Sequence, residues 1–123
     1  MRALALLLFA TTAHAQSAEA LFPAAQCAAF WLGRDDYARQ SATLAPDPTD
    51  RPRAEAYRRA AVRLNGNNAD GIDTFINGLR PTMAFLFDAW IFGGDAQARD
   101  MHTRLSRICA EAAPTFPETR DLP

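Results

Sequence analysis

Two cysteines, Cys27 and Cys109, are the residues whose type and placement predict chemistry most directly. They lie near opposite ends of the chain, and neither belongs to the C-x-x-C spacing of a redox enzyme. In an oxidising compartment, an even pair of cysteines in a small domain favours a structural disulfide. The bridge would close a loop of about 80 residues, for which the chain-entropy relation gives roughly 4.5 kcal/mol of stabilisation. We therefore predict a Cys27–Cys109 disulfide.

His102 is the only histidine beyond residue 15, so acid–base chemistry of the folded chain would depend on it. Ser106 follows at i+4, and on a helix the two side chains could touch. A hydrolase would also need an orienting acid and donors for an oxyanion, and the sequence announces neither. A structural metal site needs several histidine or cysteine ligands. We predict no metal and no cofactor, and we interpret His102 as a residue at the edge of the core, with a pH switch as the alternative.

All 13 basic residues are arginines, and they stand against 14 acidic residues for a net charge of −1. This near-neutral balance does not indicate a nucleic-acid-binding protein. The most basic stretch is residues 52–64, which carries Arg53, Arg58, Arg59 and Arg63 around a narrow apolar face. Two interpretations are open: a binding surface for an acidic partner, or a solvated helix face whose arginines pair with nearby acids of the same chain. The second is more typical of an amphipathic helix.

Residues 82–92, Thr-Met-Ala-Phe-Leu-Phe-Asp-Ala-Trp-Ile-Phe, form the longest apolar run after the N-terminus and need cover on nearly all sides. As a helix this run would span roughly 16 Å, about half of a bilayer core, so it is not a membrane span. Its only charge, Asp88, is expected to face solvent, with a buried Asp–Arg pair as the alternative. Such aromatics are most often core. The residues that would line a ligand pocket instead are Phe85, Phe87, Asp88, Trp90 and His102.

Residues 1–15 have the features of a secretory signal peptide. A basic residue, an apolar stretch and the cleavage pattern Ala13-His14-Ala15 follow one another. Cleavage there would leave one helical domain, residues 16–113, and a tail, residues 114–123. The tail contains three prolines, so we expect an extended strap, which Phe116 could anchor to the body. The predicted location is the periplasm or the exterior of the cell.

The remaining apolar residues recur with the helical period and predict an all-α bundle of four to five helices with one disulfide. The first helix is expected over residues 17–34, with Gly33 as its end. A proline-rich loop at residues 45–52 precedes a second helix over residues 52–64.

Two or three further helices are expected after the turn at residues 65–71, which lacks the acids of a calcium loop. A helix over residues 70–79 should kink or break at Pro81, because proline removes a donor and restricts the residue before it. A second helix would then follow to residue 92. The last helix begins after Asp95, and its buried stripe is Ala98, Met101, Leu105, Ile108 and Ala112.

These features favour a non-catalytic exported protein that binds another protein, as chaperones, inhibitors and immunity proteins of this general type do. Candidate surfaces are the proline-rich loop, the arginine-bearing helix and any exposed aromatics of residues 82–92. The alternative is a small apolar-ligand carrier with a pocket between helices, and a minor hydrolase using His102 is a third hypothesis. The expected partner is another periplasmic protein, with no nucleic acid and no membrane span. A monomer or small homo-oligomer is expected.

Overall fold

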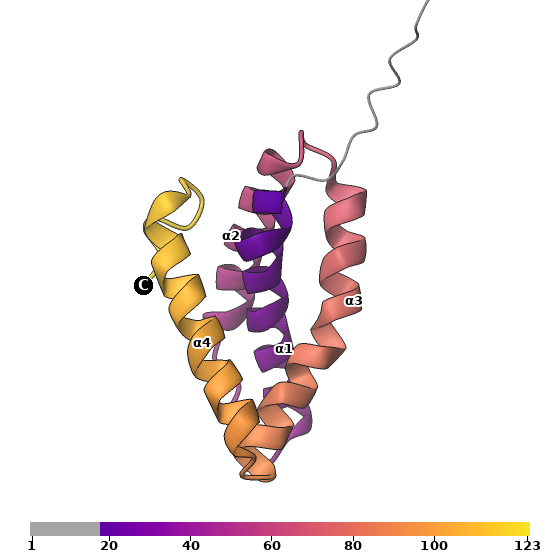
Figure 1. Ribbon diagram of the computed structural model, residues 1–123, viewed down its shortest axis with the longest axis vertical. Helices are drawn as coiled ribbons and strands as arrows, with labels where there is room; N and C mark the ends of the chain where they lie inside the picture. Colours follow the sequence, from indigo (N-terminus) through magenta and orange to yellow (C-terminus); the bar gives the residue numbers. More distant parts are fainter. Residues whose placement is uncertain (1–17) are drawn as a thin grey trace, which may run out of the picture.

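The computed structural model describes residues 18–123, and helices account for most of them (Figure 1). The elements in chain order are the π-helical turn η1 (Ala20–Ala25), α1 (Gln26–Gln40), α2 (Asp50–Leu64), α3 (Ala69–Phe87), the π-helical turn η2 (Asp88–Phe92), α4 (Ala96–Ala112) and the 3-10 turn η3 (Ala113–Thr115). No residue of 18–123 is in a β-strand, which confirms the all-α prediction for this part of the chain. The predicted signal peptide, residues 1–15, lies outside the described residues.

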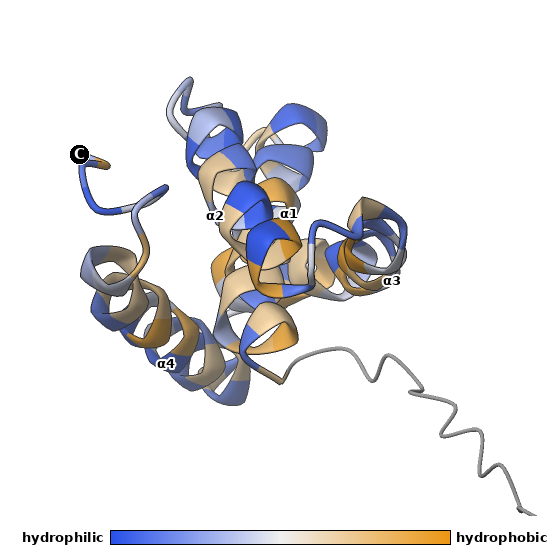
Figure 2. Ribbon diagram, turned by 90° about the horizontal axis from the view of Figure 1, so that it is seen from above, coloured by the Kyte–Doolittle hydropathy of each residue, from blue (hydrophilic) through white to orange (hydrophobic). Residues whose placement is uncertain are grey.

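Helix α1 is the centre of the bundle. It makes its most extensive contacts with α3 and α2, and α4 packs on η1 and on the end of α3 (Figure 1). Helix α4 turns its hydrophobic residues toward the other helices and its hydrophilic residues outward (Figure 2). Its buried residues are Ala98, Leu105, Cys109 and Ala112, which agree with the predicted stripe except at Met101 and Ile108.

Gly33 is the point of close approach between α1 and α3. A Cβ atom at this position would lie 2.4 Å from the Cβ of Met83 and 2.9 Å from the backbone nitrogen of Ala84. Helix α1 continues past Gly33 to Gln40, so the predicted helix end is wrong. The glycine is required because the two backbones pack closely.

Helix α3 is continuous through Pro81, so a break at this residue, one of the two predicted outcomes, is wrong. Proline within a helix costs about 3 kcal/mol. Helix α3 buries Ile72, Ile76, Met83 and Phe87, and burial of such side chains contributes roughly 1.5–3 kcal/mol each. Tertiary packing therefore outweighs the local preference. None of the helices in residues 18–123 is long and apolar enough to cross a membrane.

The predicted disulfide is present between Cys27 and Cys109, whose Cα atoms lie 5.7 Å apart. It joins α1 to α4, and both cysteines are buried. The Tyr57 hydroxyl on α2 donates a hydrogen bond to the Cys109 carbonyl. Three helices therefore meet at the bridge.

The C-terminal tail forms turns rather than the predicted extended strap, and Phe116 docks on the bundle. Phe116 and Thr119 are buried, and the Thr119 hydroxyl donates to the Ala113 carbonyl at 2.6 Å. Arg63 of α2 binds the carboxylate of Glu118. The tail is thus tied to both α4 and α2.

Candidate interaction surface

Residues 82–92 have one covered face and one uncovered face. Met83 and Phe87 are buried, and Phe87 packs on aromatic rings of α1. Phe85 and Phe92, by contrast, are 71 % and 75 % exposed. Asp88 lies at i+3 from Phe85 and is exposed, which confirms that it faces solvent. The expectation that this run is covered on nearly all sides is therefore wrong for the side of the helix that carries Phe85 and Phe92.

Met101 of α4, 42 % exposed, extends this uncovered surface. Only four large apolar side chains are exposed within residues 18–123, and three of them are Phe85, Phe92 and Met101. This clustering is unlike the scattered exposure that needs no explanation. We call the surface formed by Phe85, Asp88, Phe92 and Met101 the aromatic face.

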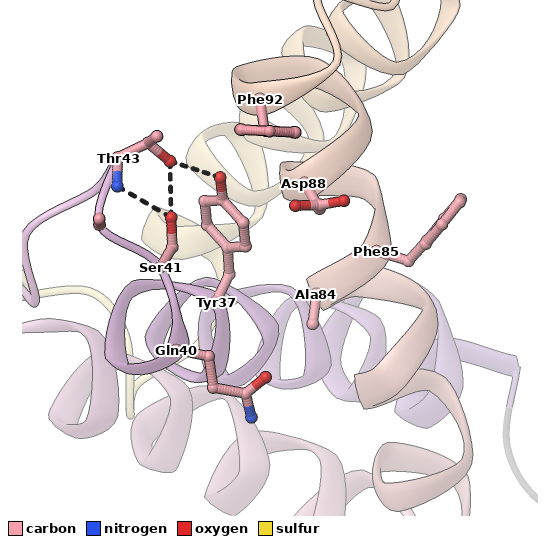
Figure 3. A pocket seen from close by; sticks show the side chains of 9 residues that line it. Tyr37, Gln40, Ser41, Thr43, Ala84, Phe85, Asp88 and Phe92 are labelled. Carbon is pink, nitrogen blue, oxygen red and sulfur yellow. Dashed lines mark hydrogen bonds between the residues drawn. The ribbon is translucent and has the colours of Figure 1, made fainter.

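A groove of about 540 Å³ lies between the aromatic face and the loop that follows α1 (Figure 3). Asp88 and Phe92 extend toward Tyr37 and this loop, whereas Phe85 points away from them. The Tyr37 and Thr43 hydroxyls are hydrogen-bonded at 2.6 Å. This bond fixes the side of the groove that the loop forms. We call this depression the loop groove.

A second groove of about 540 Å³ lies on the other side of Phe85, between α3 and α4. Its walls include Leu86, Ala89, Met101 and Leu105. Phe85 borders both grooves, so the two grooves adjoin at this residue. We call this second depression the α4 groove.

The helix widens at the end of the aromatic face, in η2. The Gly93 amide donates to the Asp88 carbonyl at 3.0 Å, five residues back. A Cβ atom at Gly93 would lie 2.7 Å from the Ala89 carbonyl oxygen, so glycine is required here. Single π-helical turns interrupt the helical period and recur at functional sites.

The two grooves are lined by carboxylates and by no basic residue. Asp88 is the only charged residue of the loop groove, and Asp95 is the only one of the α4 groove. Asp95 accepts a hydrogen bond from the Ala98 amide at 2.7 Å and so begins α4. No ion pair involves Asp88 among residues 18–123.

Most of the α2 arginines contact other parts of the fold. Arg58 forms two hydrogen bonds with Asp73 of α3, at 2.6 and 2.9 Å, and these lower the pKa of Asp73. Arg63 binds the tail, and the Arg53 guanidinium lies 4.4 Å from the centroid of the Trp31 ring. Arg59 is exposed. These contacts favour the interpretation of α2 as a helix face whose arginines pair within the fold, and they disfavour a dedicated binding surface.

The five candidate pocket residues are not brought together. Phe85 and Asp88 border the loop groove, whereas Phe87, Trp90 and His102 border a separate cavity of about 390 Å³. The His102 ring stacks on Trp90 with centroids 4.1 Å apart and contacts Phe87 edge-on at 5.3 Å. Burial, together with the positive charge of Arg34, lowers the pKa of His102.

A serine and an acid border the same cavity without forming a catalytic set. Ser106 Oγ lies 3.5 Å from His102 Nε2, at the outer limit of a hydrogen bond. Asp47 accepts hydrogen bonds from the amide and hydroxyl of Thr49 instead of from His102. Within residues 18–123, no hydrogen bond links His102 to a carboxylate and no group of acids, histidines and cysteines could hold a metal.

Two buried carboxylates were missed by sequence reasoning, and both join α1 to α2. Asp50, fully buried, accepts a hydrogen bond from Arg34 at 2.7 Å, yet burial raises its pKa. Burial alone would raise the pKa of Asp35, but hydrogen bonds from Arg39 and Arg51 outweigh it and the pKa is lowered. Their partners lie on another helix or one turn away, and no local motif marks them.

Comparison with known protein families, with characterised proteins and with solved structures finds no significant match to this chain. The function must therefore be argued from the surface itself.

Proposed function

We propose that this chain is an exported, non-catalytic protein that binds a segment of another protein on its aromatic face. The observation that carries the proposal is the clustering of Phe85, Phe92 and Met101 beside two open grooves. An exposed apolar patch with a polar rim is typical of a protein-binding surface. The signal-peptide features of residues 1–15 and the disulfide support export to a periplasm or beyond.

Burial of the two exposed rings would contribute a substantial part of a binding free energy, but a partner also needs contacts in the two grooves. A buried aromatic side chain covers about 200 Å², so covering the exposed part of Phe85 or Phe92 removes roughly 140 Å² from water. At about 25 cal/mol per Å², the two rings together contribute roughly 7 kcal/mol. Association itself costs about 4–15 kcal/mol. A partner therefore needs further contacts along the grooves, beyond the two rings.

The test is capture by cross-linking in the periplasmic or secreted fraction, using the oxidised protein from residue 16 onward. Phe85→Ser/Phe92→Ser should lose the partner captured by the unsubstituted protein. Phe22→Ser is the matched control, because Phe22 is another exposed phenylalanine, 54 % exposed, and borders neither groove. Circular dichroism should show that both variants remain helical. Capture that survives in the double variant would overturn the proposal.

A carrier of a small apolar ligand is the second candidate function, and the cavity beside His102 favours it. Its volume of about 390 Å³ lies within the usual range of ligand sites, and Trp31, Phe87, Trp90 and Ile91 supply apolar walls. Native mass spectrometry of protein purified from its natural source would show a bound small molecule, which Trp90→Ala should release. Protein without added mass would contradict this candidate.

A further inference from the structure

We infer that the partner segment is basic as well as apolar, and presents lysine or arginine side chains next to the apolar side chains that enter the two grooves. This inference rests on the proposed function and names the chemistry of the partner. It starts from the distribution of charge over the surface depressions of residues 18–123.

The two grooves of the aromatic face differ in charge from the other depressions. Each has one carboxylate and no guanidinium, Asp88 in the loop groove and Asp95 in the α4 groove. The cavity beside His102 and two smaller depressions are all bordered by arginine side chains. The nearby Arg80 is engaged with both carboxylate oxygens of Asp36. The only formal charges among the residues that line the two grooves are therefore negative.

Both carboxylates retain hydrogen-bonding capacity. Asp88 is exposed and has no ion pair among the described residues, and Asp95 uses Oδ1 for the Ala98 amide. A partner that covers the apolar walls also takes these carboxylates out of water. A carboxylate removed from water is destabilising unless a cation or donor pairs with it. A partner that places apolar side chains in the grooves and a cation at each of the two carboxylates satisfies both requirements.

The same carboxylates argue against two other occupants. An anionic membrane surface would be repelled by Asp88 and Asp95. A symmetric dimer through this face would place the carboxylates of both copies in one interface, because a two-fold interface repeats the same patch. A basic, apolar segment of a different protein is the occupant with complementary charge.

The experiment measures peptide binding by the oxidised protein from residue 16 onward. The probe is a synthetic amphipathic peptide of leucine and lysine, and its match has glutamate at every lysine position. We expect the lysine peptide to bind at least about tenfold more tightly at low salt. Raised salt should narrow the difference. Phe85→Ser/Phe92→Ser should abolish binding of the lysine peptide.

Variants then assign the charge effect to the two grooves. Asp88→Asn/Asp95→Asn should remove most of the preference for lysine, and asparagine preserves the cap of α4. Asp100→Asn is the matched control, because Asp100 is exposed on α4 and lines neither groove. The control should keep the full preference. A preference that is unchanged in the double variant would overturn the inference.

The remaining outcomes separate this inference from the proposed function. Equal binding of both peptides, lost in Phe85→Ser/Phe92→Ser, overturns the basic partner and leaves the binding face intact. Failure of both peptides, together with capture that survives the phenylalanine substitutions, overturns both proposals. Tighter binding to phosphatidylglycerol vesicles, or a dimer that Phe85→Ser/Phe92→Ser dissociates, overturns the inference in favour of a membrane or a second copy.

Discussion

Substitution of Gly33 by alanine tests the packing that places the aromatic face. The added Cβ would lie 2.4 Å from the Met83 Cβ, 2.9 Å from the Ala84 nitrogen and 3.0 Å from the Met83 carbonyl carbon. The backbone of α3 cannot turn aside as a flexible side-chain end can. Helices α1 and α3 must therefore separate, which loosens the contacts of Met83 and Phe87.

The size of the effect follows from two opposed contributions. Overpacking a well-filled site costs about 1–3 kcal/mol, and a clash with backbone belongs at the upper end. Alanine is favoured over glycine within a helix by about 1 kcal/mol. We expect Gly33→Ala to lower the free energy of unfolding by about 2 kcal/mol. For a domain of about 100 residues this lowers the Tm by roughly 10 °C.

The assay is thermal and urea unfolding of the oxidised protein, followed by far-ultraviolet circular dichroism. Gly78→Ala is the matched control, because Gly78 also lies inside a helix and a Cβ there meets nothing within 4 Å. The control should be more stable, by up to about 1 kcal/mol. Opposite signs for the two variants are predicted. Equal or greater stability of Gly33→Ala would refute the close packing of α1 on α3.

Three further predictions concern the disulfide, an ion pair and pH. Cys27→Ser/Cys109→Ser should lower the free energy of unfolding by about 4 kcal/mol in urea titrations, because the long loop is no longer closed; a loss below about 1 kcal/mol would contradict this reasoning. Arg58→Ala should lower the free energy of unfolding by about 1 kcal/mol, since it removes a two-point contact with a partly exposed carboxylate. Arg59→Ala, the control, should change this free energy by less than about 0.5 kcal/mol. Equal losses in the two variants would contradict the assigned ion pair. The lowered pKa of His102 means that its contribution to stability is present above the ordinary pKa of histidine and is lost as pH falls through the folded-state pKa. Unfolding followed from pH 7 to pH 5 should show this loss, and it should be absent in His102→Phe; an identical pH profile of the two proteins would refute the assignment.

The helical class and the disulfide could be predicted because they depend on features that can be read along the chain. Periodicity marks the helices, and the even number of cysteines together with the predicted oxidising compartment indicates the bridge. Gly33 and Pro81 were misassigned for one physical reason. Their local preferences favour a helix end or break, and the contact of α1 with α3 overrides those preferences.

The candidate surface could be predicted only in part. Residues 82–92 stand out in the sequence as apolar, but which rings are covered depends on where α1 packs. Phe87 and Phe85 are two positions apart, yet Phe87 is buried and Phe85 is exposed. The choice between a binding role and a pairing role for Arg58 depends on Asp73, which lies on a different helix. No local pattern encodes either outcome.

The central claim is that the aromatic face is open in the free protein. Hydroxyl-radical footprinting of the oxidised monomer, read by mass spectrometry, tests it most directly. Rapid modification of Phe85, Phe92 and Met101 is predicted, together with protection of the buried pair Phe87 and Met83. Equal protection of all five side chains in the free monomer would contradict the account.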